Sequence, residues 1–412
     1  MELASIQAHA LSSPIDPVQE RSFHGGVRRL LKRDVVVVIV ETLDGARGIA
    51  PAGASSSAMR EFFEGDSQQA FAETIESRLA PALTDRRFES PGELREAVAK
   101  IGLPDRVTSE ALGALDVAFH DLLGKEQGRS VAAILAENGS IDRELALYAS
   151  AGMYMPPSGY IEQAARLEEH GFFGYKYRPG IGPEADRETV EGLAERLGSM
   201  HLMLDAHTWW KIPGEAYDTE TVTDLVGHAG DHDAYWVEEP VEPSDYDGYR
   251  RLARLNVPLA GGESEPHPAG LRSLAETGAV SFLQGDVRHH AGFTGCWELA
   301  TACPEWGIQF VPHHFGTWLG LIANAQLVAA APETTLLEYP VFTGDPLLGS
   351  DTDLGMYPFP LAFDLIEETP RVTDGILTVP DAPGLGVTLN DDALEDYPFQ
   401  EGPWTTFEAT GE

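Results

Sequence analysis

Basic residues are scarce in this sequence of 412 residues. It contains 28 lysines and arginines against 66 aspartates and glutamates, and its formal net charge is −38 at pH 7. A surface this acidic repels phosphate groups, so we expect neither nucleic acids nor anionic membranes as partners. The acids lie beside apolar residues along the whole chain, which indicates a folded surface and not a disordered acidic tail. We interpret this charge as an adaptation to high salt, where screening weakens the repulsion.

Cysteines and long apolar runs are scarce as well. Cys296 and Cys303 are the only cysteines, and both fall in one expected helix. Their spacing fits neither a disulfide framework nor a zinc motif. The apolar run Val35–Val40 is too short to cross a bilayer, and the first residues lack the pattern of a signal peptide. We therefore expect a soluble, cytoplasmic protein.

The first 140 residues predict an α+β domain. The runs Leu3–Leu11 and Asp34–Thr42 predict strands, with a polar loop between them. Helical periodicity follows at 67–82, 91–101 and 109–124, and Thr108 or Ser109 is the expected cap of the last helix.

From residue 145 onwards, short apolar runs alternate with helical stretches. Eight runs predict strands, at 145–151, 174–178, 202–205, 235–239, 258–263, 280–286, 308–313 and 335–339. This alternation requires parallel strands and favours a (β/α) barrel over residues 141–350. An open doubly wound sheet is the alternative, although no glycine-rich phosphate fingerprint follows any run. We expect residues 351–412, rich in Pro, Gly and Asp, to return to the N-terminal domain.

Ionisable residues end seven consecutive runs, where the active sites of barrels lie. They are Lys176 and Arg178, Asp205 and His207, Glu238 and Glu239, Glu263, Asp286, His313 and His314, and Glu338. Three carboxylates from adjacent strands would repel one another without a cation. A hard divalent ion resolves this conflict, and an all-oxygen ligand set suits Mg²⁺ best.

Short motifs at these strand ends occur in a characteristic order. They are "YKYR" at 175–178, "LMLDAH" at 202–207, "WVEEP" at 236–240, "AGGES" at 260–264, "LQGDV" at 283–287, "VPHHFG" at 311–316 and "LLEYP" at 336–340. Together with "ALGALDVAFHDLLGKEQGRSV" at 111–131 and "PDAPGLGVTL" at 380–389, they resemble the enolase superfamily, mandelate racemase group. The resemblance implies a modified TIM barrel of (β/α)7β form. It also implies an α+β capping domain, formed by the N-terminal segment and the C-terminal return, and a homo-oligomer.

The resemblance implies a set of metal ligands. It makes Asp205, Glu238 and Glu263 the ligands of Mg²⁺. Of the adjacent acids Glu238 and Glu239, the first is chosen because the family tolerates another residue at the second position.

The resemblance also implies a base and its partners. Asp286 and His313 match a dyad in which the carboxylate orients a basic imidazole, with the neighbouring His314 as the alternative base. Glu338 matches an acid that faces the substrate carboxylate. Lys176 matches a cation that helps to neutralise the enolate, whose developing charge needs concentrated positive charge nearby.

Two departures from the group's pattern bear on the reaction. Arg178 stands where the racemase pattern has a second lysine base, and a guanidinium is a poor base. His207 resembles the histidine of some acid-sugar dehydratases that acts as general acid on the leaving hydroxyl; a hydrogen-bonding role behind the ligands is the alternative. Elimination needs proton removal from one face only, so a single histidine base suits it.

We therefore expect dehydration of an aldonate-like sugar acid to a 2-keto-3-deoxy acid. A racemase or epimerase of a hydroxy acid is one alternative, and a non-catalytic binding barrel is another. Further residues are candidates for the pocket: His289 and His290, Trp209 and Trp210, and, from the first domain, His24 and Arg28.

Overall fold

The computed structural model describes residues 1–53, 67–137, 139–207 and 217–409 of the chain. The expected pocket residues Trp209 and Trp210 lie outside these ranges. In the described part of the chain, no helix combines the length and the apolar character that are needed to cross a membrane.

A four-stranded antiparallel sheet forms the capping domain together with the helices of the N-terminal segment. Its strands are β1 (Leu3–Phe23), β2 (Gly26–Thr42), β3 (Arg47–Ala52) and, from the other end of the chain, β14 (Thr405–Ala409). Strand β2 is central: its first residues pair with β14 and its last residues pair with β3. The helices are α1 (Ser67–Thr74), η2 (Ile75–Leu79), α2 (Ala80–Leu83), α3 (Pro91–Ala99), α4 (Asp105–Gln127) and α5 (Val131–Leu135).

Two expectations for this domain are wrong in detail. The predicted polar loop between the first two strands is instead a long hairpin, in which Phe23 pairs with Gly26. Most β1 residues beyond Pro14 are partly or fully exposed, so they lack the alternation that signals a strand. The third helix, α4, begins at Asp105 and not at the expected cap; Ser109 lies inside it and donates a hydrogen bond to the His289 carbonyl (3.0 Å).

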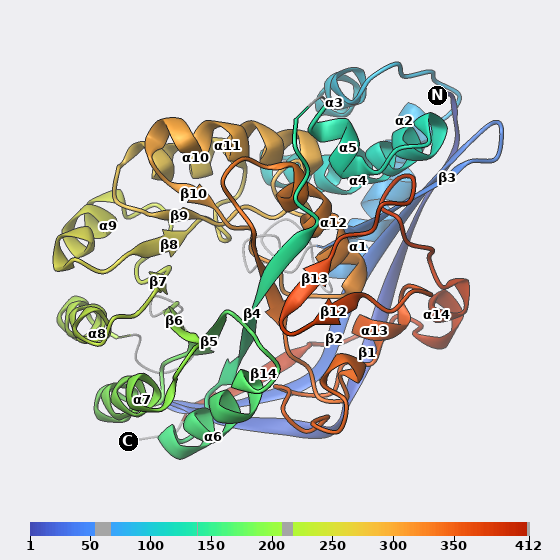
Figure 1. Ribbon diagram of the computed structural model, residues 1–412. Coiled ribbons are helices and arrows are strands. Elements are labelled where there is room, and N and C mark those ends of the chain that lie inside the picture. Colours follow the sequence, from blue (N-terminus) through green and yellow to red (C-terminus); the bar gives the residue numbers. More distant parts are fainter. Residues whose placement is uncertain (54–66, 138, 208–216, 410–412) are drawn as a thin grey trace.

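Eight parallel strands build the barrel (Figure 1). They are β4 (Glu144–Met153), β5 (Gly174–Arg178), β6 (His201–Asp205), β7 (Trp236–Glu238), β8 (Leu259–Gly261), β9 (Phe282–Leu283), β10 (Gln309–Phe310) and β11 (Leu336–Pro340). All eight fall within or beside the runs predicted from the sequence. Strand β4 pairs with both β5 and β11, which brings the first and last strands of the series together.

Helices follow the first seven of these strands and lie outside the ring (Figure 1). They are α6 (Pro157–Glu168), α7 (Pro183–Arg196), α8 (Thr219–Asp231), α9 (Tyr246–Leu252) with η3 (Ala253–Leu255), α10 (Pro268–Glu276), α11 (Gly292–Trp306) and α12 (Trp318–Ala330). This is the expected (β/α)7β barrel, and the open sheet is excluded. Both cysteines are buried in α11.

The interior of the barrel is layered. Its lower layer is apolar and consists of Tyr148, Met203, Trp236, Ala260, Phe282, Val311 and Leu336. Because side chains alternate along a strand, the residues two positions further on also point inward. Those residues include Asp205, Glu238, His313 and Glu338, so the polar layer lies at the carboxyl ends of the strands.

The segment after the barrel contributes to both domains. It contains η4 (Pro346–Leu348), α13 (Leu361–Asp364), β12 (Arg371–Thr373), β13 (Ile376–Thr378) and α14 (Asp391–Asp396) before β14. The β12–β13 hairpin pairs with β4 of the barrel, whereas β14 joins the capping sheet. The sequence predicted only the return to the N-terminal domain, and not the hairpin that pairs with the barrel.

Candidate active site

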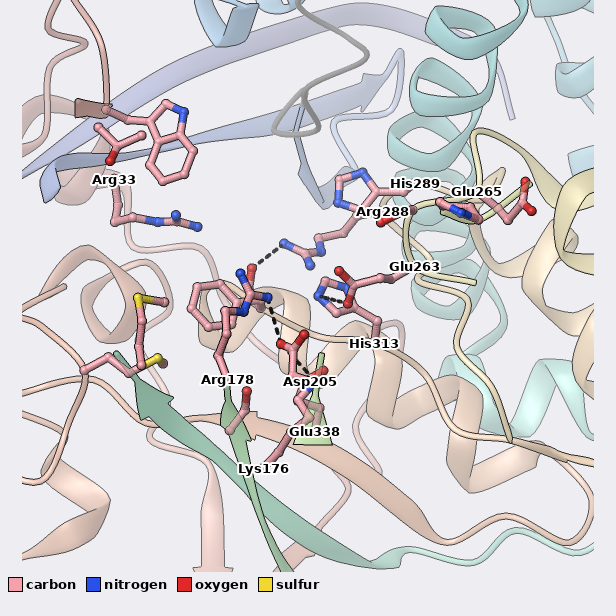
Figure 2. A pocket seen from close by; sticks show the side chains of 18 of the residues that line it. Arg33, Lys176, Arg178, Asp205, Glu263, Glu265, Arg288, His289, His313 and Glu338 are labelled. Atoms are coloured by element: carbon pink, nitrogen blue, oxygen red, sulfur yellow. Dashed lines mark hydrogen bonds and ion pairs between the residues drawn. The ribbon is translucent and has the colours of Figure 1, made fainter. Parts of the chain in front are cut away.

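A cavity of about 900 Å³ lies at the carboxyl ends of the barrel strands, beneath the capping domain. The barrel contributes Lys176, Arg178, Asp205, Glu263, His313 and Glu338 to its wall; the capping domain contributes Arg28, Arg33, Trp404 and Phe407. Figure 2 shows the barrel residues gathered around one centre, with Arg33 on the other side.

The three expected metal ligands come from adjacent strand ends. Asp205 and Glu238 are register partners on β6 and β7, and Glu263 follows β8. Glu238 is fully buried, and both its oxygens are engaged: Lys176 Nζ donates to Oε1 (2.8 Å) and Gln284 Nε2 donates to Oε2 (2.7 Å). Burial raises the pKa of Glu238 to about 8, although Lys176 acts in the opposite direction.

Lys176 is held between two buried carboxylates. Its Nζ lies 2.8 Å from Glu238 and 2.7 Å from Glu338, whose other oxygen accepts a hydrogen bond from the backbone N–H of His314 (2.9 Å). Burial acts to lower the pKa of Lys176, but the facing carboxylates outweigh it and raise the pKa well above its usual value. The lysine is thus a fixed positive charge at the floor of the cavity.

Arg178, the second cation of β5, binds Asp205. Its Nη2 lies 2.8 Å from Asp205 Oδ2. The pKa of Asp205 is well below its usual range: burial opposes this shift, but Arg178, His207 and Lys176 outweigh it.

His207 lies among carboxylates and is not one of the residues that line the cavity. Its Nδ1 contacts Asp205, and its Nε2 lies 2.9 Å from Glu263 and 3.1 Å from Glu239. Burial acts to lower the pKa of His207, but Asp205 and Glu263 raise it well above the usual value. This placement favours the alternative in which His207 supports the ligands, over contact with a leaving group.

Glu239 directly follows β7, and its positive φ of 40° departs from the extended strand conformation. Its Oε1 accepts hydrogen bonds from the backbone N–H groups of Gly262 (3.2 Å) and Ser264 (3.0 Å). One potential ligand atom from each of His207, Glu239 and Glu263 lies within 4.8 Å of the other two. The structure therefore offers a second acid, besides Glu238, for the metal site.

His313 has carboxylates on both sides of its ring. Its Nδ1 lies 3.2 Å from Asp286 and its Nε2 lies 3.2 Å from Glu263. Burial acts to lower the pKa of His313, but Glu263 and Asp286 raise it to about 9. His313 lines the cavity, whereas His314 is buried outside it, and desolvation holds the pKa of His314 well below the usual range. The geometry favours His313 as the base.

The remaining candidates divide between the cavity and the domain interface. His289 lines the cavity and pairs with Glu110 of α4 (2.6 Å), while His290 is buried, with its Nε2 against the Glu265 carbonyl (2.9 Å). Arg28 lines the cavity as well. His24 instead lies at the tip of the capping hairpin, where its backbone N–H donates to the Gly180 carbonyl (2.7 Å).

In the polar cluster of the barrel, sequence reasoning missed Gln284 and Arg288. Gln284, which directly follows β9, donates a hydrogen bond to Glu238. Arg288 forms an ion pair with Asp286, donating from Nε to both carboxylate oxygens (3.1 and 3.0 Å). Gln284 could have been found, because it stands two positions before Asp286 and therefore on the same inward face. Arg288 lies in a loop, where no periodicity applies.

The site meets the chemical requirements of a metal centre. Three buried carboxylates, of Asp205, Glu238 and Glu239, lie close to the partly buried Glu263, and Lys176, Arg178 and His207 lie against this group. Carboxylate oxygens are the ligands that hard divalent cations prefer. These acidic residues and His207 are therefore candidates for holding a metal ion.

Comparisons with known proteins agree with this fold. Residues 159–393 match the family described as "Enolase C-terminal domain-like", and residues 14–136 match "Mandelate racemase / muconate lactonizing enzyme, N-terminal domain". The chain therefore belongs to the enolase superfamily, in the mandelate racemase/muconate lactonizing enzyme family.

Individual relatives carry names for acid-sugar enzymes. The chain is 30% identical to the D-galactarolactone cycloisomerase of Agrobacterium fabrum over 293 residues, which is 70% of this chain and 73% of that protein. It is 27% identical to the D-xylonate dehydratase of Haloferax volcanii, over 70% of this chain and 69% of that one. The crystal structure of the 3,6-anhydro-D-galactonate cycloisomerase from Zobellia galactanivorans superposes with a TM-score of 0.78 at 24% identity, covering 97% of this chain and 100% of that one.

Proposed function

We propose that this protein is a Mg²⁺-dependent dehydratase of a sugar acid and forms a 2-keto-3-deoxy acid. The observation that carries the proposal is the position of His313, which lines the cavity with Asp286 behind it and Glu263 beside it. An imidazole held in this way suits the removal of a carbon-bound proton.

Asp205, Glu238 and Glu263 would hold the ion, with Glu239 as the competing fourth acid. When bound, Mg²⁺ supplies a Lewis acid for the substrate carboxylate, whose charge increases as the neighbouring C–H bond breaks. Lys176 adds a fixed positive charge beside these ligands, and Glu338 fixes the other side of that lysine.

His313 carries out the proton transfers. Its Nε2 takes the proton from the carbon next to the carboxylate, and Asp286 stabilises the resulting imidazolium. The C–O bond at the next carbon then breaks, and the hydroxyl leaves as water with a proton from His313. His207 lies among carboxylates and not at the cavity wall, so we assign it to holding Asp205 and Glu263 in place; donation from His207 is the alternative. The enol product tautomerises to the keto acid.

Arg178 favours dehydration over two-base racemisation. It occupies the position of a possible second base on β5, but it is paired with Asp205 and a guanidinium stays protonated in proteins. A single base removes the proton from one face only, which suits elimination of a hydroxyl from the next carbon. Racemisation or epimerisation is the competing reaction.

Product analysis across a panel of sugar acids, with Mg²⁺ in deuterated water, tests the proposal. We expect a keto acid from one or a few substrates. Deuterium exchange with inversion and without loss of water would show a racemase or epimerase instead. His313→Asn should abolish turnover while Mg²⁺ still binds, whereas His289→Asn, which changes the cavity histidine paired with Glu110, should keep most activity.

A further inference from the structure

The capping wall of the cavity carries a buried arginine that has no acidic partner among the described residues. Arg28 of β2 is 3% exposed and lines the cavity. Its guanidinium lies over the rings of Trp404 (4.9 Å) and Phe407 (5.6 Å), and its Nε donates to the Thr405 hydroxyl (3.2 Å). Among the residues that the structure describes, no carboxylate forms an ion pair with it. The aromatic rings hold the group in place, but they do not neutralise it in the way that a carboxylate would.

A second arginine of the same strand, the partly buried Arg33, lies in a similar setting. Arg33 also lines the cavity, and its guanidinium lies over the rings of Phe315 (5.2 Å) and Trp404 (5.3 Å). Its buried Nε has no hydrogen-bond partner in the described part of the chain. The acid nearest in sequence, Asp34, is already bound by Lys32 Nζ (3.0 Å) and the Ser12 hydroxyl (2.6 Å).

The composition of the chain makes this pair of arginines unusual. With 66 acidic and 28 basic residues, carboxylates are available to most guanidinium groups. Arg29, between the two on β2, binds both Glu20 (2.5 Å) and Glu408 (2.6 Å). Arg178 and Arg288 in the same cavity are also paired with acids. Within the described part of the chain, Arg28 and Arg33 lack such partners at the place where a ligand would lie.

The arginines also act on one another. Burial lowers the pKa of Arg28 to about 10, and the positive charges of Arg178 and Arg33 act in the same direction. An anion that binds between cations that repel one another is stabilised, because they supply it with both positive charge and hydrogen-bond donors.

We infer that Arg28 and Arg33 form a distal subsite for a second anionic group of the substrate. The substrate would then be a sugar acid with a carboxylate or a phosphate at its far end, and not a simple aldonate. This inference rests on the proposed function, in which the first carboxylate lies at the barrel end near Lys176. The planar guanidinium group of arginine binds carboxylate and phosphate groups equally well in its geometry. The test therefore includes a separate ligand for each of these two anionic groups.

The test compares three ligands of equal chain length and stereochemistry. They are an aldonate, the matching dicarboxylate, and the aldonate phosphorylated at its far end. Binding to the full chain with Mg²⁺ is measured by calorimetry at one fixed KCl concentration, for the wild type, Arg33→Gln and Arg28→Gln. The matched control is Arg29→Gln, which removes a charge from the same strand outside the cavity.

We expect the wild type to bind one of the two doubly anionic ligands about 10 to 100 times more tightly than the aldonate. Arg33→Gln should remove most of this preference and leave aldonate binding within about threefold, and Arg29→Gln should retain the preference. Arg28→Gln should act in the same direction, and its unfolding midpoint shows whether it is folded. Equal binding of all three ligands by the wild type, or a preference that Arg33→Gln leaves intact, would overturn the inference.

The two proposals fail separately. If an aldonate is dehydrated efficiently and Arg33→Gln has no effect on any of the ligands, the proposed function stands and the subsite does not exist. If no sugar acid is turned over but binding of the dianion depends on Arg33, the subsite stands and the proposed function is wrong.

Discussion

The Nδ1 atom of His313 lies 3.2 Å from Oδ2 of Asp286. Asp286 is fully buried and also binds Arg288, so the position of its carboxylate does not depend on the imidazole alone. Burial opposes ionisation of Asp286, but Arg288 and His313 keep its pKa well below the usual range. The imidazole is therefore oriented by a permanent negative charge.

The dyad predicts the effect of Asp286→Asn. The amide keeps the shape but loses the charge that stabilises the imidazolium, so we expect kcat to fall by about 10² to 10⁴-fold. The Mg²⁺ dissociation constant should change little, because Asp286 is not among the proposed ligands. Steady-state kinetics and calorimetry measure the two quantities. A normal kcat in a folded variant would show that His313 does not depend on this carboxylate.

The adjacent acids Glu238 and Glu239 make the ligand set testable. Glu238 points into the barrel beside Asp205, whereas Glu239 is bound by backbone N–H groups and faces His207. We expect Glu238→Gln to weaken Mg²⁺ binding by about 10 to 100-fold and Glu239→Gln to weaken it less. Calorimetric titration of both variants compares the two acids directly, since each variant replaces one carboxyl group by an amide. If Glu239→Gln weakened Mg²⁺ binding more than Glu238→Gln, Glu239 would be the metal ligand.

His207 has two possible roles that leave different kinetic signatures. If it supports Asp205 and Glu263, His207→Asn should raise the Mg²⁺ concentration needed for half activity by about 10 to 100-fold. Activity at saturating Mg²⁺ should then recover to within about tenfold of the wild type. A low kcat that no Mg²⁺ concentration restores would identify His207 as the general acid.

The sequence reveals much of this site because barrel geometry is periodic. Parallel strands end at one face, and alternation fixes which residues point inward, so Asp205, Glu238 and His313 can be placed together without coordinates. The choice between Glu238 and Glu239 cannot be made in this way. It depends on the positive φ at Glu239 and on backbone donors from the next strand end, which are tertiary features.

The capping domain was harder to predict. Its hairpin reaches far beyond the apolar runs, because the outer part of β1 is paired by hydrogen bonds although few of its side chains are buried. The positions of Arg28 and Arg33 in the cavity depend on this hairpin and on β14, which comes from the other end of the chain. No local pattern links segments so far apart in sequence.

The charge of the protein predicts a dependence on salt. Helix α7 alone exposes Glu184, Glu188, Glu191 and Glu195, and the chain as a whole carries a net charge of −38. Screening of this repulsion should raise the thermal unfolding midpoint, on the order of 10 °C between dilute buffer and molar KCl. The measurement is made with a chelator present, so that trace divalent ions bound at the active site do not contribute. A midpoint that is the same in dilute and molar KCl would refute adaptation to salt.

Asp345 predicts a pH dependence of stability away from the active site. Its buried carboxyl accepts a hydrogen bond from Tyr339 (2.8 Å), and burial raises its pKa from 3.8 to about 6. The native state therefore binds this proton more tightly than the unfolded state does. The resulting stabilisation is at most about 3 kcal/mol. It is complete below about pH 4 and is lost as the pH rises to about 6.

The variant Asp345→Asn isolates this effect, because the amide cannot titrate. We expect the difference in free energy of unfolding between wild type and variant to change across pH 4 to 6 in favour of the variant, and to stay constant above about pH 7. Tyr339→Phe provides the control: the Tyr339 hydroxyl acts to lower the pKa of Asp345, so its removal should move the window to higher pH. Urea unfolding at a series of pH values gives these differences. Parallel curves for wild type and Asp345→Asn would mean that Asp345 has the same pKa in the native and unfolded states.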